Sequence, residues 1–215
     1  MRKLSFIILF ICSLSYIFCF SQREKQNGAI IDKEAENIIE QIAKTLKKDM
    51  PLSIEFAMVE KNGKNQKGTL KLNESSYRAN LNGNTIICNG NTLYLYQKAT
   101  NEININDASE ADNNILNVYK FIKDANKNFR AKKIREENNN NILDLIPRKS
   151  SEFSKVRIRV NKKTYQISSI EVHYKNSQGE YSYNILKYNK NIKINSKDFA
   201  FDKKEFPNAE IIDLR

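Results

Sequence analysis

The sequence predicts an α+β protein that is mainly β, with helices packed on one face of an antiparallel sheet of about ten strands. From Leu52 onward, short runs alternate apolar and polar residues, which is typical of half-buried strands. Asn-Gly pairs at Asn62, Asn82 and Asn89 separate several of these runs and favour two-residue hairpin turns. Two other segments repeat their apolar residues at helical spacing. There is no internal repeat or linker, so we expect one domain after the N-terminal segment.

Residues 1–21 have the pattern of a secretory signal peptide. A short basic start precedes an apolar run that continues to Phe20, and small residues lie near Ser21. We expect cleavage near Ser21, which leaves residues 22–215 as a single exported domain. Two alternatives remain open, because the run approaches the length of a membrane anchor and Cys19 is a candidate for lipid modification.

The cysteine content predicts one buried thiol, and the charge limits the classes of partner. After cleavage Cys88 is the only cysteine, and its place on an apolar strand predicts a buried side chain. The formal net charge of +11 suits an anionic membrane surface or an acidic partner. Because the lysines are scattered and no reading motif is present, we expect no nucleic acid partner.

A first helix is predicted from Ile31 to Asp49. Asp32 can cap its start, and Pro51 ends it. Apolar residues at three- and four-residue steps form one stripe, which consists of Ile31, Ala35, Ile38, Ile39, Ile42, Ala43 and Leu46. The stripe predicts a helix that lies across the open face of the sheet.

Strands follow this helix directly. The run from Leu52 to Met58 alternates cleanly and places Leu52, Ile54, Phe56 and Met58 on one face. From Gly68 to Ile105 the same alternation, broken by Asn-Gly pairs, predicts an antiparallel meander.

Ala108–Asn128 changes period and predicts a second helix between strands, with a loose turn at Asp107–Ser109 as an alternative at its start. Its apolar positions are Ile115, Leu116, Val118, Tyr119, Ile122 and Ala125. A helix inserted between strands of one antiparallel sheet is well placed to act as a lid or a plug.

The C-terminal part returns to hairpins. The expected strands are Phe129–Glu136, Asn141–Pro147, Val156–Asn161, Tyr165–Tyr174 and Glu180–Tyr188, followed by a tail that contains Phe199–Phe201. In the third of these strands Val156, Ile158 and Val160 point inward, and Arg157 and Arg159 point outward.

Residues for catalysis or metal binding are scarce. His173 is the only histidine, and its alternation places it on the polar surface of a strand without a serine elbow elsewhere. A zinc site would have only His173 and Cys88 to draw on, and Asp107, Glu110 and Asp112 lack the spacing of a calcium loop. We therefore expect neither an enzyme nor a resident cofactor or metal.

Apolar surface is more abundant than a plain sheet needs. Thr85–Cys88, Leu93–Tyr96 and Ile142–Ile146 are apolar on both faces. Such strands are covered on both sides or line a cavity on one. A curved sheet of this size can enclose a small apolar ligand, and a fully packed core is the alternative.

The chain resembles the periplasmic outer-membrane lipoprotein carrier family, LolA, over nearly all of residues 22–215. Three places carry the resemblance: the first helix leading into Leu52–Phe56, the strand-turn-strand unit Thr85–Gln97, and the ending Phe199–Arg215. The ending resembles the C-termini of Bacteroidetes-type members.

The resemblance implies an unclosed, strongly curved antiparallel β-barrel whose helices form a lid over an apolar cavity. It implies a periplasmic, monomeric carrier that uses no cofactor. Such a carrier receives acylated lipoproteins from an inner-membrane release transporter and delivers them to an outer-membrane acceptor. In many members an arginine holds the lid shut, but this chain has Glu74 near that place, and Arg78 is only a neighbour.

These arguments give two sets of candidate residues. The cavity lining, or the core beneath it, is predicted to be Ile54, Phe56, Met58, Leu70, Leu72, Leu81, Ile86, Leu93, Leu95, Ile158 and Val160. The underside of the lid is predicted to be Ile38, Ile42, Leu116 and Tyr119. Alternative functions are a lipid-binding or lipoprotein-sensing module of the same fold, an exported β-protein with a filled core, and a hydrolase, which the missing catalytic residues disfavour.

Overall fold

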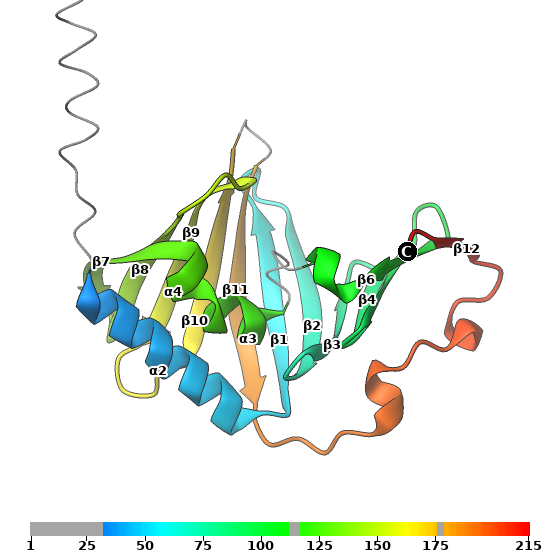
Figure 1. Ribbon diagram of the computed structural model, residues 1–215, viewed down its shortest axis with the longest axis horizontal. Coiled ribbons are helices and arrows are strands. Elements are labelled where there is room, and N and C mark those ends of the chain that lie inside the picture. Colours follow the sequence, from blue (N-terminus) through cyan, green and yellow to red (C-terminus); the bar gives the residue numbers. More distant parts are fainter. Residues whose placement is uncertain (1–31, 112–116, 176–178) are drawn as a thin grey trace, which may run out of the picture. The chain divides into compact units, whose positions relative to one another are not determined.

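The computed structural model describes residues 32–111, 117–175 and 179–215. Within them, one sheet has the strand order β12-β6-β5-β4-β3-β2-β1-β11-β10-β9-β8-β7 (Figure 1). Because β12 and β7 end this order and do not pair with each other, the sheet is unclosed. The prediction of a mainly β protein with an open, curved sheet is confirmed, but the sheet has twelve strands instead of about ten.

The strands are antiparallel throughout except for β12, which pairs with β6 in parallel. Their bounds are β1 Leu52–Glu60, β2 Asn65–Asn73, β3 Ser76–Leu81, β4 Asn84–Asn89, β5 Thr92–Gln97, β6 Glu102–Asp107, β7 Phe129–Glu137, β8 Asn140–Pro147, β9 Phe153–Asn161, β10 Ile167–Tyr174, β11 Glu180–Asn189 and β12 Glu210–Asp213. The Asn82-Gly83 pair forms the predicted two-residue turn between β3 and β4, with φ angles of 52° and 80°. Positive φ angles at both positions are what such a turn requires.

The first helix, α2 (Lys33–Asp49), matches its prediction from Asp32 onward. The Asp32 carboxylate accepts a hydrogen bond from the Ala35 backbone N–H at 3.0 Å and caps the helix. Its other oxygen accepts from the backbone N–H of Lys133 in β7 at 2.8 Å. One side chain therefore starts the helix and joins it to the edge of the sheet.

The predicted second helix is divided in the structure, and a turn lies near its predicted start. The chain forms a 3-10 turn, η1 (Ala108–Ala111), and two short helices, α3 (Val118–Lys123) and α4 (Ala125–Asn128). The expected helical positions Ile115 and Leu116 lie outside the described residues. Asn117 caps α3 by accepting a hydrogen bond from the Lys120 N–H at 3.0 Å, which fixes the phase of a helix only six residues long.

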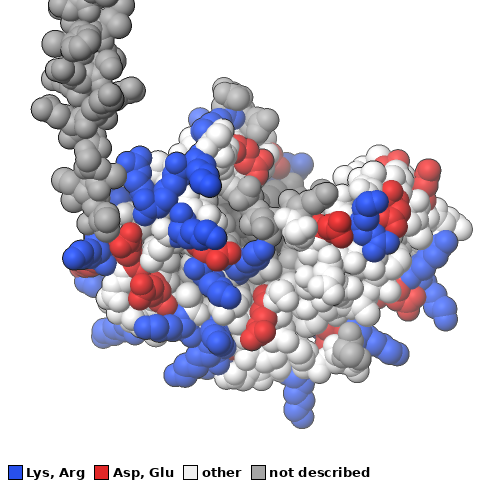
Figure 2. All heavy atoms as spheres, viewed as in Figure 1, with Lys and Arg blue, Asp and Glu red and all other residues white. Residues whose placement is uncertain are grey.

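Two separate apolar clusters hold the fold together. The larger lies between the sheet and the helices α2, α3 and α4. The smaller lies on the opposite face of β4, β5 and β6, where Phe201, Phe206 and Ala209 of the C-terminal segment cover it. This segment contains the 3-10 turns η2 (Ser196–Phe199) and η3 (Lys203–Glu205) before β12. Lysine and arginine side chains are spread over the surface (Figure 2).

Candidate functional site

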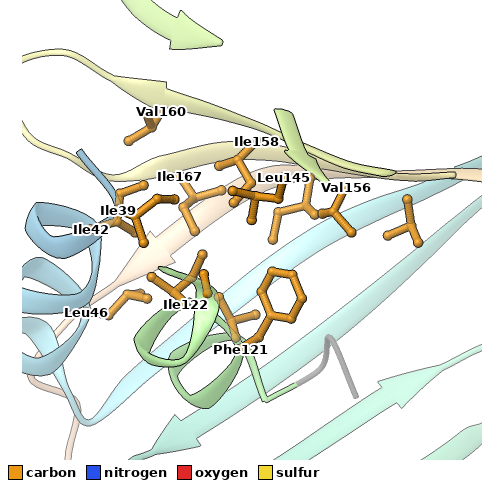
Figure 3. Packing of buried hydrophobic residues seen from close by; sticks show 14 of the residues in the cluster. Ile39, Ile42, Leu46, Phe121, Ile122, Leu145, Val156, Ile158, Val160 and Ile167 are labelled. Atoms are coloured by element: carbon orange, nitrogen blue, oxygen red, sulfur yellow. The ribbon is translucent and has the colours of Figure 1, made fainter. Parts of the chain in front are cut away.

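The face of the sheet under the helices brings all eleven predicted lining residues into one hydrophobic cluster. Figure 3 shows part of this cluster, with Ile158 and Val160 among the labelled residues. Eight of the eleven lining residues are buried: Ile54, Phe56, Met58, Leu70, Leu72, Leu93, Ile158 and Val160. Leu81, Ile86 and Leu95 are half-buried against the same cluster. The alternation in β9 is as predicted, because Val156 is buried whereas the Arg157 guanidinium reaches the Asp144 carboxylate at 2.7 and 2.9 Å on the other face.

The helical cover combines predicted and unpredicted residues. Ile38 and Ile42 of α2 are buried in the cluster, and Tyr119 of α3 is half-buried against it. The fourth predicted residue, Leu116, lies outside the described residues. Phe121 and Ile122 of α3, 5% and 0% exposed, lie under the helix against the sheet (Figure 3). Phe121 was missed because its inward position depends on where this short helix begins.

An apolar cavity of about 140 Å³ opens beside this cluster. Its walls come from β1, β3, β4 and β11, through Phe56, Ala79, Leu81, Asn84, Ile86 and Tyr183. Sequence reasoning missed Tyr183, whose ring meets Phe56 edge-on with centroids 5.9 Å apart. Burial, helped by Tyr174 and Tyr181, raises the pKa of Tyr183 to about 12, so its hydroxyl is neutral at physiological pH.

Gly68 sets the position of the Phe56 ring. The two residues are opposite each other in β2 and β1, and a Cβ on Gly68 would lie 2.4 Å from Phe56 Cζ. The pairing of β1 with β11 has a bulge at this point, which leaves Leu186 of β11 55% exposed. Bulges redirect nearby side chains. The missing side chain of Gly68 thus gives Phe56 room to lie at the wall of the cavity.

Helix α2 is joined to the sheet at both ends. Asp32 holds its start, as described above. At its end, the Asp49 carboxylate accepts hydrogen bonds from the Tyr188 hydroxyl at 3.1 Å and from Gln166 Nε2 at 3.4 Å. Asn126 of α4 donates to the Glu36 carbonyl at 3.0 Å, which connects the short helices to α2. Because isolated helices this short are unstable in water, α3 depends on its packing for its position.

The arginine nearest to the family's lid position takes no part in this cover. Arg78 forms an ion pair with Glu205 of the C-terminal segment, on the other face of the sheet. The polar contacts of α2 and α4 therefore join the helices to the sheet without it.

The candidate catalytic groups lie away from the cavity. His173 is on the outer face, as predicted, but it is half-buried instead of exposed. Its Nδ1 lies 2.7 Å from Glu180, while its buried Nε2 makes no hydrogen bond within the described chain. Cys88 is buried as predicted, and burial raises the pKa of its thiol.

The part of the chain that the structure describes has neither a group of metal ligands nor a helix suited to span a membrane. No three histidine, cysteine, aspartate or glutamate side chains are grouped there as metal ligands would be. None of the helices in that part is both long and apolar enough to cross a membrane. The predicted signal peptide, residues 1–21, lies outside it.

Comparison with known proteins gives a family and a fold. A family model described as outer membrane lipoprotein carrier protein LolA matches residues 17–178. No curated protein matches significantly. Because the family match ends at residue 178, the likeness of the C-terminal segment to Bacteroidetes-type members stays a prediction.

Among solved structures, an uncharacterized conserved protein from Thermus thermophilus is 10% identical with a TM-score of 0.56, over 84% of this chain and 99% of that one. MucB is 13% identical with a TM-score of 0.51, over 80% of this chain and 64% of MucB. A LolA superfamily protein from Nitrosomonas europaea is 10% identical with a TM-score of 0.42, over 78% and 97% of the two chains. At these identities the first two structures indicate a shared fold alone.

Proposed function

Because the chain belongs to the LolA family of outer membrane lipoprotein carriers, we propose that it binds the acyl chains of lipoproteins between the sheet and α3 and carries them from the inner to the outer membrane. The observation that supports this most is the way in which the apolar face is covered. Its cover includes two short helices, and an apolar cavity opens at Phe56 and Ala79 of the same cluster. The residues predicted to line the cavity are the proposed contacts of the acyl chains.

The energetics of an acyl chain fit such a cover. Each methylene removed from water contributes about 0.8 kcal/mol, so an acyl chain needs an apolar enclosure to cross an aqueous compartment. The cavity of about 140 Å³ is smaller than the roughly 300–1,000 Å³ of usual ligand pockets. A whole chain would therefore need the space that Phe121 and Ile122 occupy. We propose that lipid displaces α3, which closes again over the empty face.

Photo-crosslinking tests this proposal directly. A photoreactive residue at Phe56 or Leu95 should form adducts with lipoproteins in cells, because both positions belong to the proposed lining. The matched control is Ile211, an apolar residue of the same sheet that is exposed on β12. Absence of adducts from both Phe56 and Leu95, or equal adducts from Ile211, would contradict the proposal. Depletion of the protein should also cause lipoproteins to accumulate at the inner membrane.

A second candidate is a lipid-binding or lipoprotein-sensing module that does not shuttle its ligand. It is kept because MucB has the same fold and has been crystallised in complex with another protein, MucA. The two functions differ in what depletion does, since only loss of a carrier would leave lipoproteins at the inner membrane. Lipid extraction and mass spectrometry of the purified protein would identify the lipid bound in either case.

A further inference from the structure

A cationic pocket lies where the short helices meet the sheet. It has a volume of about 300 Å³ and lies between α3, α4, the start of β7 and the segment that follows β8. Four cationic side chains line it, Lys120, Lys127, Arg148 and Lys149, together with a single carboxylate, Asp124. Lysine and arginine side chains are visible around this part of the surface in Figure 2.

The cations of this pocket are unevenly neutralised. Arg148 is held in place, because its Nε donates to the Phe129 carbonyl at 3.0 Å and its Nη2 lies 3.6 Å from Glu36. Lys127 and Lys149 are exposed and form no ion pair with any residue of the described chain. By contrast, Lys133 of β7 and Lys162 both contact Glu136. Among the described residues, no carboxylate forms an ion pair with Lys127 or Lys149, so the pocket holds positive charge at these two positions.

One wall of the pocket is apolar and belongs to the large cluster. Phe129 lines the pocket, is buried, and packs against Phe121 of α3 with ring centroids 5.3 Å apart. Phe129 therefore belongs both to the lining of the cationic pocket and to the hydrophobic cluster. A ligand with a phosphate group and an apolar tail suits such a site.

We infer that this pocket binds the phosphate group of an anionic membrane phospholipid and so docks the α3–α4 side of the protein on a bilayer surface. The inference rests on the proposed carrier function, because docking there places α3 beside the source or the destination of the acyl chains. Each lysine or arginine near an anionic surface adds to the free energy of binding. Lys127 and Lys149 are therefore the residues to change.

Vesicle binding tests the pocket. The whole mature protein is mixed with vesicles of phosphatidylglycerol and phosphatidylcholine, and with vesicles of phosphatidylcholine alone. We expect binding to the anionic vesicles only. The K127Q/K149Q variant should bind them roughly 30-fold more weakly, because each lysine contributes about five-fold near such a surface. The matched control is K44Q/K163Q, which removes the same charge from two exposed lysines outside the pocket lining.

Three outcomes would overturn the inference. Equal weakening in the two variants would indicate attraction by net charge alone. Binding of inorganic phosphate, measured by calorimetry, without binding to vesicles would identify a free anion as the ligand. Binding of a polyglutamate peptide without binding to vesicles would identify an acidic protein partner.

The carrier function is tested separately by uptake of the apolar dye bis-ANS in the absence of vesicles. K127Q/K149Q should keep this uptake. If the unaltered protein binds anionic vesicles but takes up no apolar ligand, the carrier proposal fails while the phosphate pocket stands.

Discussion

Strands β4 and β5 carry apolar side chains on both faces, and the two faces are covered in different ways. On the outer face, Tyr94 stacks on Phe201 with centroids 4.6 Å apart and rings within 8° of parallel. Tyr96 packs on Phe206 at the same centroid distance. On the inner face, Ile86 and Leu95 of the same strands remain half-buried, and Ile86 borders the cavity.

The covers also differ in how they are held. The C-terminal segment is joined to the sheet by the β12–β6 ladder, by the Lys71–Asp198 ion pair at 2.6 Å and by the Arg78–Glu205 pair. The inner cover includes α3, a six-residue helix that depends on packing. One face is thus closed by aromatic stacking and strand pairing. The other has a cover that, under the proposed function, a competing apolar ligand displaces.

The largest expected effect is on stability, from Phe206→Ala in the outer cover. Phe206 is 6% exposed, so its loss removes a buried ring and leaves a hole that the paired segment cannot easily close. We expect the free energy of unfolding, measured in urea, to fall by about 3–5 kcal/mol. Uptake of bis-ANS by the folded variant should stay unchanged. A marked gain in uptake would mean that the outer face is also a ligand site.

Phe121→Ala makes the corresponding change in the inner cover. Because α3 can settle into part of the space, we expect a loss near the lower end of that range, about 3 kcal/mol. Unlike Phe206→Ala, it should strengthen bis-ANS binding, since the ring no longer competes for the apolar face. Lys123→Ala on the same helix is the control, because Lys123 is exposed. Weaker dye binding in Phe121→Ala would show that Phe121 contacts the ligand instead of excluding it.

The comparison also explains which features the sequence could predict. Alternation correctly assigned Ile158 and Val160 to the inner face and Arg157 to the outer one, because a period of two is a local property of a strand. Alternation could not say what covers an apolar face. The residues of β4 and β5 therefore predicted either that both faces are covered or that one face lines a cavity. In the structure the outer face is covered, and Ile86 of the inner face borders a cavity.

The features that were missed depend on contacts distant in sequence or on helix phase. β12 has four residues and pairs with β6, about a hundred residues earlier. No local sequence pattern therefore predicts this parallel pairing. Phe121 points inward because Asn117 starts α3, a boundary that a longer predicted helix concealed. Tyr183 becomes a cavity wall only once β11 pairs with β1.

Gly68→Ala tests the role of the Phe56 ring in the wall of the cavity. The added Cβ would lie 2.4 Å from the Phe56 ring and 2.9 Å from the Asn80 carbonyl oxygen, so the ring must shift. Overpacking of this kind costs about 1–3 kcal/mol. We expect the shifted ring to narrow the cavity and weaken bis-ANS uptake, with little effect from the control Thr69→Ala on the exposed side of β2. Unchanged uptake would place the bound dye away from Phe56.

The smallest effects should come from the aspartate that anchors each cover. Burial opposes ionisation of Asp32, but the Ala35 and Lys133 N–H groups together outweigh it and lower the pKa. For Asp198, the Asn195 N–H and then the Lys71 ammonium lower the pKa. Both carboxyls release their protons more readily in the folded protein. Each therefore stabilises it above the ordinary pKa of 3.8, and this stability is lost as the pH falls below that value.

Asp32→Ala and Asp198→Ala should each lower stability by about 1 kcal/mol at neutral pH, since each removes a capping carboxylate. The free energy of unfolding, measured from neutral to acid pH, should fall less steeply in both variants than in the unaltered protein. Only Asp32→Ala should increase bis-ANS uptake, because only Asp32 holds a helix over the inner face. If both variants increased uptake equally, the inner and outer covers would be coupled, and the C-terminal segment would take part in opening the cavity.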